Sequence, residues 1–226
     1  MQIVNIITQY YPSFFKALGI TLQMTVISLL CATVLGVIFG LFKVSDFKVL
    51  KLIADVYIDI IRGTPLLVQV MIMMYGVGSV LKSYGFQWSN IGGAFTAGCV
   101  ALSLNAGAYM AEIIRGGIEA VDKGQMEAAR SLGLSYGKAM RKVILPQAFR
   151  TMLPSIINQF IISLKDTSLV SVIGPRELTQ NGKIIAANSA SMVMPIWICV
   201  ALFYLVVCTI LSRIAKYVER RVSYGK

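Results

Sequence analysis

Residues 122–150, DKGQMEAARSLGLSYGKAMRKVILPQAFR, form the longest polar interruption in an otherwise apolar chain. Cations are spread through this stretch, Gly133 divides it, and Pro146 stands near its end. Glycine suits a sharp turn and proline disfavours a helix interior. The pattern predicts two short helical pieces joined at Gly133, with Pro146 breaking the helix before the next apolar segment.

The composition of the whole chain is that of an integral membrane protein. It has 226 residues, of which 57% are hydrophobic and 14% charged, and its mean hydropathy is +0.74. A soluble domain of ordinary composition has far more charge. We therefore expect one all-α membrane domain over residues 1–226, with residues 122–150 as a loop inside it.

Five apolar stretches are long enough to cross a bilayer, for which about 20 residues are needed. They cover about residues 18–42, 53–81, 91–114, 151–173 and 192–214. The second is interrupted at residues 62–65 and the fourth contains Lys165 and Asp166. Residues 174–191 are too polar to span, and they form a cap helix, a docking surface or an ordinary connecting loop.

The net charge of +11 is explained by topology better than by nucleic acid, because no basic face interleaved with aromatic residues is present. An amino terminus outside and a carboxyl terminus in the cytoplasm leave few cations outside. Those outside would be Lys16, Lys82, Arg176 and Lys183. The cytoplasm would hold Lys43, Lys48, Lys51, Arg115, Lys123, Arg130, Lys138, Arg141, Lys142, Arg150, Arg213, Lys216, Arg220, Arg221 and Lys226.

Several kinds of chemistry lack their usual residues. The chain has no histidine, and no pair of its four cysteines has metal-ligand or redox spacing. It also lacks a Gly-x-x-x-x-Gly-Lys-Ser/Thr phosphate loop. We therefore expect no catalytic residues, no metal and no bound cofactor in this chain.

The long polar stretch resembles the EAA loop of permease subunits of binding-protein-dependent ABC importers. The signature positions are Glu127, Ala128, Ala129, Gly133, Leu145 and Pro146. The family has Ile where this chain has Val143, a conservative change. Residues 19–23, 62–69, 108–118 and 164–169 look like the polar amino acid branch of that family, so the resemblance covers most of the chain.

The resemblance implies a fold like that of type I ABC importer permeases, in a bacterial plasma membrane. It also implies a separate cytoplasmic ABC ATPase dimer that binds ATP and Mg and grips the loop at the six signature residues. An extracytoplasmic binding protein would deliver an amino acid, and a second permease chain, identical or similar, would complete the path. The alternative is a channel or receptor-like subunit whose loop anchors a partner without ATP-driven transport.

Ionisable groups inside spans are costly and usually face a partner or a water-filled cavity. Arg62, Glu112, Arg115 and Lys165 are interpreted as gating or structural charges, with Glu112 and Arg115 one helical turn apart. The hypothesis for the solute path names Thr64, Asn105, Tyr109, Asp166, Thr167 and Ser168. Asp166 would accept the cationic group of an amino acid, and hydroxyl groups would donate to its carboxylate. An ion pair or an interfacial position of residues 165–166 is the structural alternative.

Overall fold

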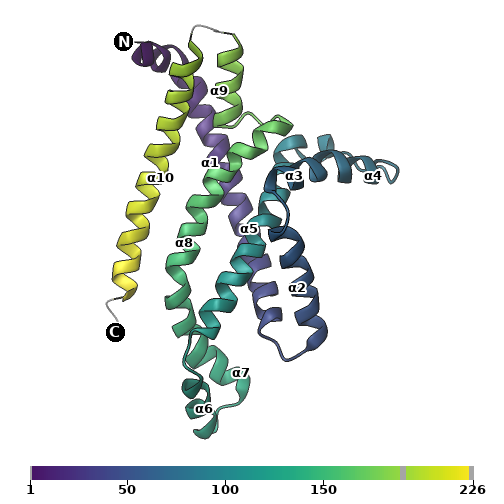
Figure 1. Cartoon of the computed structure of the whole chain (residues 1–226), viewed down its shortest axis with the longest axis vertical. Coiled ribbons are helices and arrows are strands. Elements are labelled where there is room, and N and C mark those ends of the chain that lie inside the picture. Colours follow the sequence, from purple (N-terminus) through teal and green to yellow (C-terminus); the bar gives the residue numbers. More distant parts are fainter. Residues whose placement is uncertain (1, 189–191, 224–226) are drawn as a thin grey trace.

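The computed structural model describes the backbone of residues 2–188 and 192–223, where helices are joined by turns and short irregular connections and no strand is present. The long helices are α1 (Gln2–Lys43), α5 (Gly93–Glu119), α8 (Leu145–Val170) and α10 (Val193–Ser223). Figure 1 shows α10 and α8 running along the long axis, with α5 beside α8 on the side of α2 and α1 crossing behind them. Four helices are long and apolar enough to span a membrane, or five if one bent pair counts as a span.

The bent pair confirms the interruption at residues 62–65, although the size of the bend could not be predicted. Helix α2 (Lys48–Arg62) meets the helical run 66–82 at 101°. That run consists of α3 (Leu66–Met71), the π-helical η1 (Ile72–Val77) and α4 (Gly78–Lys82). In Figure 1 it projects sideways from the body and returns to α5 through η2 (Trp88–Ile91).

The centre of the bundle is the packing of α1 on α5. Close approach is possible because α1 has glycine at the contact: a Cβ on Gly36 would lie 2.4 Å from Met110 Cβ. Gly40 likewise stands against Ala111 and Ile114. Small residues at four-residue spacing allow this kind of contact in membrane proteins. Helix α5 is consequently the most enclosed of the long helices.

The polar stretch forms a compact turn at one end of the molecule, as predicted. It contains α6 (Lys123–Ser131), α7 (Tyr136–Ala139) and the π-helical η3 (Met140–Ile144). Figure 1 places α6 and α7 beyond the ends of α5 and α8. At the opposite end, η4 (Ser171–Ile173) and the cap helix α9 (Leu178–Ala187) connect α8 to α10.

The prediction that Pro146 breaks the helix is wrong. A continuous helix runs from Tyr136 to Ile173, and Pro146 lies at the start of α8 without interrupting it. Proline lacks an N–H and clashes with the preceding turn of a regular α-helix. The preceding turn here is the wider π-helix η3, which relieves that clash by changing the hydrogen-bond register.

Candidate functional site: an intramembrane cavity and the loop below it

The break between α2 and α3 is stabilised by one side-chain amide. Gln69 Nε2 donates hydrogen bonds to Ile61 O at 2.7 Å, to Thr64 O at 3.0 Å and to Thr64 Oγ1 at 2.9 Å. Its Oε1 accepts a hydrogen bond from Asn105 Nδ2 of α5 at 3.0 Å. Backbone carbonyls freed by a broken helix need such partners inside a membrane. Gln69 therefore fixes the bend and ties it to α5.

A cavity of about 610 Å³ opens beside this break. Its lining residues come from the break, from α5 and from α8, and they are Arg62, Gly63, Thr64, Pro65, Leu66, Asn105, Tyr109, Gln159, Ile162 and Asp166. The volume lies within the usual range for small-molecule sites. Three segments that are far apart in the sequence thus supply one polar cavity.

The cavity brings together four of the six residues in the predicted solute path, namely Thr64, Asn105, Tyr109 and Asp166. The other two lie elsewhere. Thr167 is fully buried and donates its hydroxyl hydrogen to Leu164 O at 2.7 Å. Ser168 lines a separate cavity together with Lys165. Successive residues on a helix point about 100° apart, which explains why the run 165–168 is divided between two sides.

Two lining groups carry opposite charges, Asp166 from α8 and Arg62 from the end of α2. Arg62 lies 5.3 Å from the centroid of the Tyr109 ring, a cation–π contact. Thr64 donates its hydroxyl hydrogen to Ile60 O, so toward the cavity this oxygen is an acceptor. The cavity therefore offers a cation, an anion and neutral polar groups on one surface.

Two glutamines with a role at the site, Gln69 and Gln159, are not among the residues of the predicted solute path. Gln159 is buried, lines the cavity, and has its Nε2 3.4 Å from Ser163 Oγ. Each glutamine is an amide inside an apolar run, and a buried amide must find hydrogen-bond partners. That signal was present in the sequence. Asn105, a partner of Gln69, lies on another helix, whereas Ser163, the partner of Gln159, lies one turn away on α8.

A network of charges borders the cavity where α1, α2 and α5 meet. Glu112 of α5 accepts from Arg115 at 2.9 Å and lies 3.4 Å from Lys43 Nζ and 3.6 Å from Arg62 Nη1. Lys43 also pairs with Asp55. The predicted pairing of Glu112 with Arg115 is present, and Glu112 additionally joins the ends of α1 and α2. Arg62 belongs both to this network and to the cavity lining.

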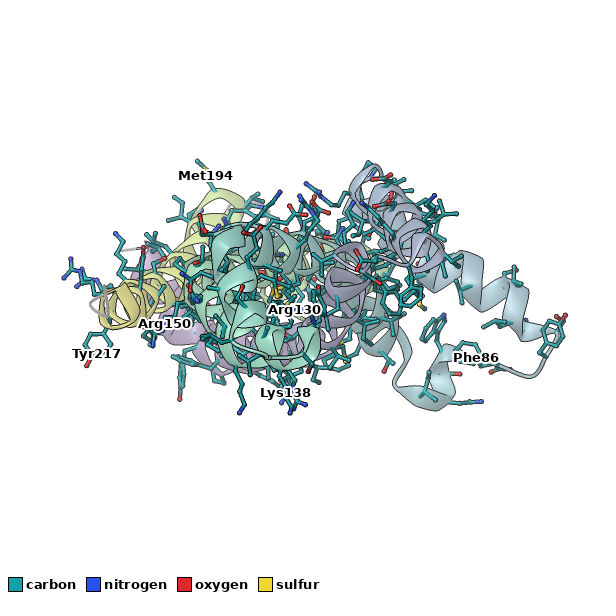
Figure 2. All side chains as sticks on the ribbon, turned by 90° about the horizontal axis from the view of Figure 1, so that it is seen from below. Phe86, Arg130, Lys138, Arg150, Met194 and Tyr217 are labelled. Carbon is teal, nitrogen blue, oxygen red and sulfur yellow. The ribbon has the colours of Figure 1, made fainter. Side chains whose placement is uncertain are left out.

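The loop at the other end presents an apolar tip. Leu132 is 85% exposed, and the following Gly133 has a φ of +82°, a conformation that other residues rarely adopt. Asp122 caps α6 by accepting a hydrogen bond from Gly124 N at 2.7 Å. Figure 2, viewed from this end, shows Arg130 and Lys138 on the loop. An exposed leucine among cations is suited to seating in a partner's groove.

The six signature residues of the loop differ in exposure. Glu127, Ala128, Gly133 and Pro146 are exposed, whereas Ala129 is buried and Leu145 is partly buried in the cluster formed with Ile144 and Ala148. Leu145 belongs to the apolar cluster in which α8 packs on Ile114 and Ile118 of α5. The exposed members form the surface that a partner could contact.

At the opposite end, a buried carboxylate fixes the cap helix α9. Glu177 is fully buried and caps α9 by accepting from Gln180 N at 2.6 Å and Thr179 N at 2.9 Å. Tyr204 of α10 donates its hydroxyl hydrogen to the same group at 2.9 Å. Burial raises the pKa of Glu177, although these hydrogen bonds oppose the shift. The cap helix is thus attached to α10 by one acidic side chain.

This raised pKa predicts a pH-dependent stability. A carboxyl group whose pKa is higher in the folded than in the unfolded state stabilises the fold below its unfolded pKa, and that contribution is lost as the pH rises through the folded pKa. We expect the melting temperature of the detergent-solubilised protein to fall as the pH rises from about 4 through that interval. In Glu177→Gln this fall should be reduced. An unchanged pH profile in this variant would contradict the assignment to Glu177.

No group of three or more histidine, cysteine, aspartate or glutamate residues within the described ranges could hold a metal ion. The cavity is instead lined by residues suited to a small polar molecule.

The comparisons with known proteins identify the class. Residues 32–224 match the family model described as the binding-protein-dependent transport system inner membrane component. The chain belongs to this family.

Individual relatives carry amino acids. The chain is 41% identical over 212 residues to the arginine transport system permease protein ArtQ of Bacillus subtilis, covering 94% of this chain and 93% of the relative. It is 40% identical over 213 residues to the glutamine transport system permease protein GlnP of Escherichia coli K12, covering 94% of each.

Solved structures agree with the fold. A crystal structure of an amino acid ABC transporter with histidines matches with a TM-score of 0.85 and 42% identity, over 95% of this chain and 96% of that one. The MetNI methionine ABC transporter in an inward-facing conformation matches with a TM-score of 0.75 at 18% identity, over 92% and 95% of the two chains. The second likeness concerns the fold alone. The expected type I importer architecture is confirmed.

Proposed function

We propose that this permease carries a polar amino acid through the cavity beside the broken span. The observation that supports this most directly is the placement of Arg62 and Asp166 on one cavity surface. A zwitterionic solute needs an acceptor for its ammonium group and a donor for its carboxylate, and charge-assisted hydrogen bonds are the strong ones. The relatives that transport arginine and glutamine support the same solute class.

In this proposal, Asp166 binds the ammonium group or a cationic side chain, and Arg62 binds the carboxylate. Thr64, Asn105, Tyr109 and Gln159 fix the orientation of the solute. The solute site opens alternately to the two sides of the membrane as two permeases rock against each other. Gln69 contributes indirectly, because it holds Thr64 and Asn105 in position.

The energy would come from a separate ATPase dimer that binds ATP and Mg and grips the loop 122–150. An extracytoplasmic binding protein would deliver the solute at the end where α9 lies. This arrangement requires the amino terminus and α9 outside and the loop in the cytoplasm, in agreement with the excess of Lys and Arg at the loop end. The alternative of a channel or receptor-like subunit is favoured neither by the fold nor by the relatives.

The test is amino-acid-dependent ATP hydrolysis by the complete importer in proteoliposomes. We expect Asp166→Asn to raise the solute concentration needed for half-maximal stimulation by roughly 10- to 100-fold, since a hydrogen bond to a charged group contributes about 1.5–3 kcal/mol. The matched control is Asp59→Asn, which makes the same change on the exposed side of α2. Identical solute dependence in the two variants would disprove the role of Asp166.

A separate measurement identifies the solute. Mass spectrometry of small molecules that copurify with the solute-loaded binding protein names the amino acid directly. If the importer responds to glutamine and to no cationic amino acid, Asp166 binds the α-ammonium group rather than a side chain.

A further inference from the structure

Helix α8 presents a continuous stripe of exposed side chains along its length. The stripe comprises Thr151, Ser155, Asn158, Ile162, Lys165 and Leu169. The spacings are four, three, four, three and four residues, so these residues share one face of the helix. Four of the six are polar. A face of this kind inside a membrane span is too polar to contact lipid, and it needs either water or another protein chain.

The solute cavity opens onto the same face. Ile162, in the middle of the stripe, is also part of the cavity lining, and Asp166 lines the cavity one helical turn further along. Lys165 lies on the stripe itself and is exposed. It borders a second cavity of about 360 Å³ with Ser168 and Tyr204, which gives its long side chain room to move.

Lys165 and Asp166 are also unusual among the charges inside the bundle. Lys43, Arg62, Glu112 and Arg115 all take part in ion pairs. Neither Lys165 nor Asp166 has an ion-pair partner within 4 Å among the residues that the structure describes. Although adjacent, they point about 100° apart and do not reach each other. Two opposite charges thus remain to be neutralised at one level of the span.

A second copy of this chain would supply the missing ion-pair partners of Lys165 and Asp166. Two copies inserted in the same orientation are related by a two-fold axis along the membrane normal, and in such an interface residue i contacts j while j contacts i. The axis leaves the height of each residue unchanged, and Lys165 and Asp166 differ in height by only about 1.5 Å. Lys165 of one copy is therefore level with Asp166 of the other.

We propose that two copies of this chain pair through the α8 stripe and that Lys165 of each forms an ion pair with Asp166 of the other, which closes the path until a solute arrives. This inference rests on the proposed solute site. An amino acid carries both charges, so its ammonium group can replace Lys165 at Asp166 while its carboxylate binds the released Lys165 or Arg62. Solute binding thus breaks the ion pair between the two copies and opens the gate in the same step. Lys165 of the second copy then contributes to the selection of the solute.

Cross-linking tests the contact without relying on transport. The four native cysteines are replaced by serine, and two differently tagged copies are expressed together with the ATPase, one with Lys165→Cys and the other with Asp166→Cys. We expect a short bis-maleimide to join them in the absence of solute. The matched control pairs Asp166→Cys with Thr151→Cys, which lies on the same stripe but about 22 Å away along the helix and should not react.

Two results would overturn the proposal. In the first, Asn158→Cys of one copy is cross-linked to Asn158→Cys of the other, but Lys165→Cys and Asp166→Cys give no product. This would show that the two α8 stripes are in contact but that Lys165 and Asp166 are not. The other is the absence of any product along the stripe. Failure of the proposed function is distinguishable, because it appears as absence of amino-acid-dependent ATP hydrolysis in the wild type and leaves the cross-links unaffected.

ATP hydrolysis without solute provides a second readout. If the ion pairs hold the closed state, Lys165→Met should raise solute-independent hydrolysis by roughly tenfold, a size typical of coupling between sites. Lys165→Arg, which keeps the charge, should restore the low rate. Equal solute-independent rates in wild type and Lys165→Met would refute the gating role.

Discussion

Gly133→Val should abolish transport while leaving the permease inserted in the membrane. The φ of +82° at Gly133 is strongly unfavourable for a β-branched residue. The turn between α6 and α7 must then open, which displaces the exposed Leu132 from the position in which a partner would meet it. We expect uptake in proteoliposomes to fall to the level of protein-free vesicles. The amount of permease in membranes, measured by immunoblot, should stay near that of the wild type.

Two variants of the same loop make this test specific. Gly137→Val introduces the same side chain at a glycine that has no positive φ and no neighbour within 4 Å of an added Cβ. It should retain most of the transport activity. Gly133→Asn should be intermediate, because asparagine tolerates the left-handed conformation. If Gly133→Val and Gly137→Val behave alike, the conformation of the turn is not what matters.

Glu112→Gln is expected to cause a large loss of stability. The carboxylate faces Lys43, Arg62 and Arg115 together, and its side chain is only 19% exposed. Removing one member of a largely buried ion pair typically costs 3–5 kcal/mol, and the partial exposure here reduces this to about 2–4 kcal/mol. Thermal unfolding of the detergent-solubilised protein should show the effect as a clearly lower melting temperature.

The matched control is Glu119→Gln on the same helix. Glu119 also pairs with Arg115, but its side chain is 54% exposed, and exposed ion pairs contribute about 0–1 kcal/mol. Its melting temperature should remain close to that of the wild type. Equal losses in the two variants would show that the position of Glu112 between three cations has no special importance.

Much of the fold was predictable because the membrane imposes simple rules on the sequence. The length of the apolar stretches predicts the spans, and Gly133 predicts the turn between two short helices. The interruption at residues 62–65 was recognised because glycine and proline stand together in an apolar run. The bend of 101° could not be predicted, since it depends on hydrogen bonds between Gln69, Ile61 and Asn105, which the fold brings together.

Some residues of the candidate site could be predicted from the sequence, but the complete set of cavity-lining residues could not. Asp166 is predicted as a solute contact because isolated charges inside spans are costly, whereas Arg62, which also lines the cavity, is predicted as a gating or structural charge. Thr167 and Ser168 were included because they follow Asp166 in the sequence, yet the rotation of the helix directs them away from the cavity. Gln159 is missing from the predicted path although its partner Ser163 is one turn away, because the sequence does not show which side of α8 lines the cavity.

The failure of Pro146 to interrupt the helix has a mechanical consequence. The helix from Tyr136 to Ile173 contains 38 residues, which at 1.5 Å each is about 57 Å of unbroken rod. One end of this rod lies in the loop, and Asp166 lies near the other. A push or twist applied at α7 is therefore transmitted along one continuous helix toward Asp166, and its two irregular points are the π-helical turn η3 and Pro154.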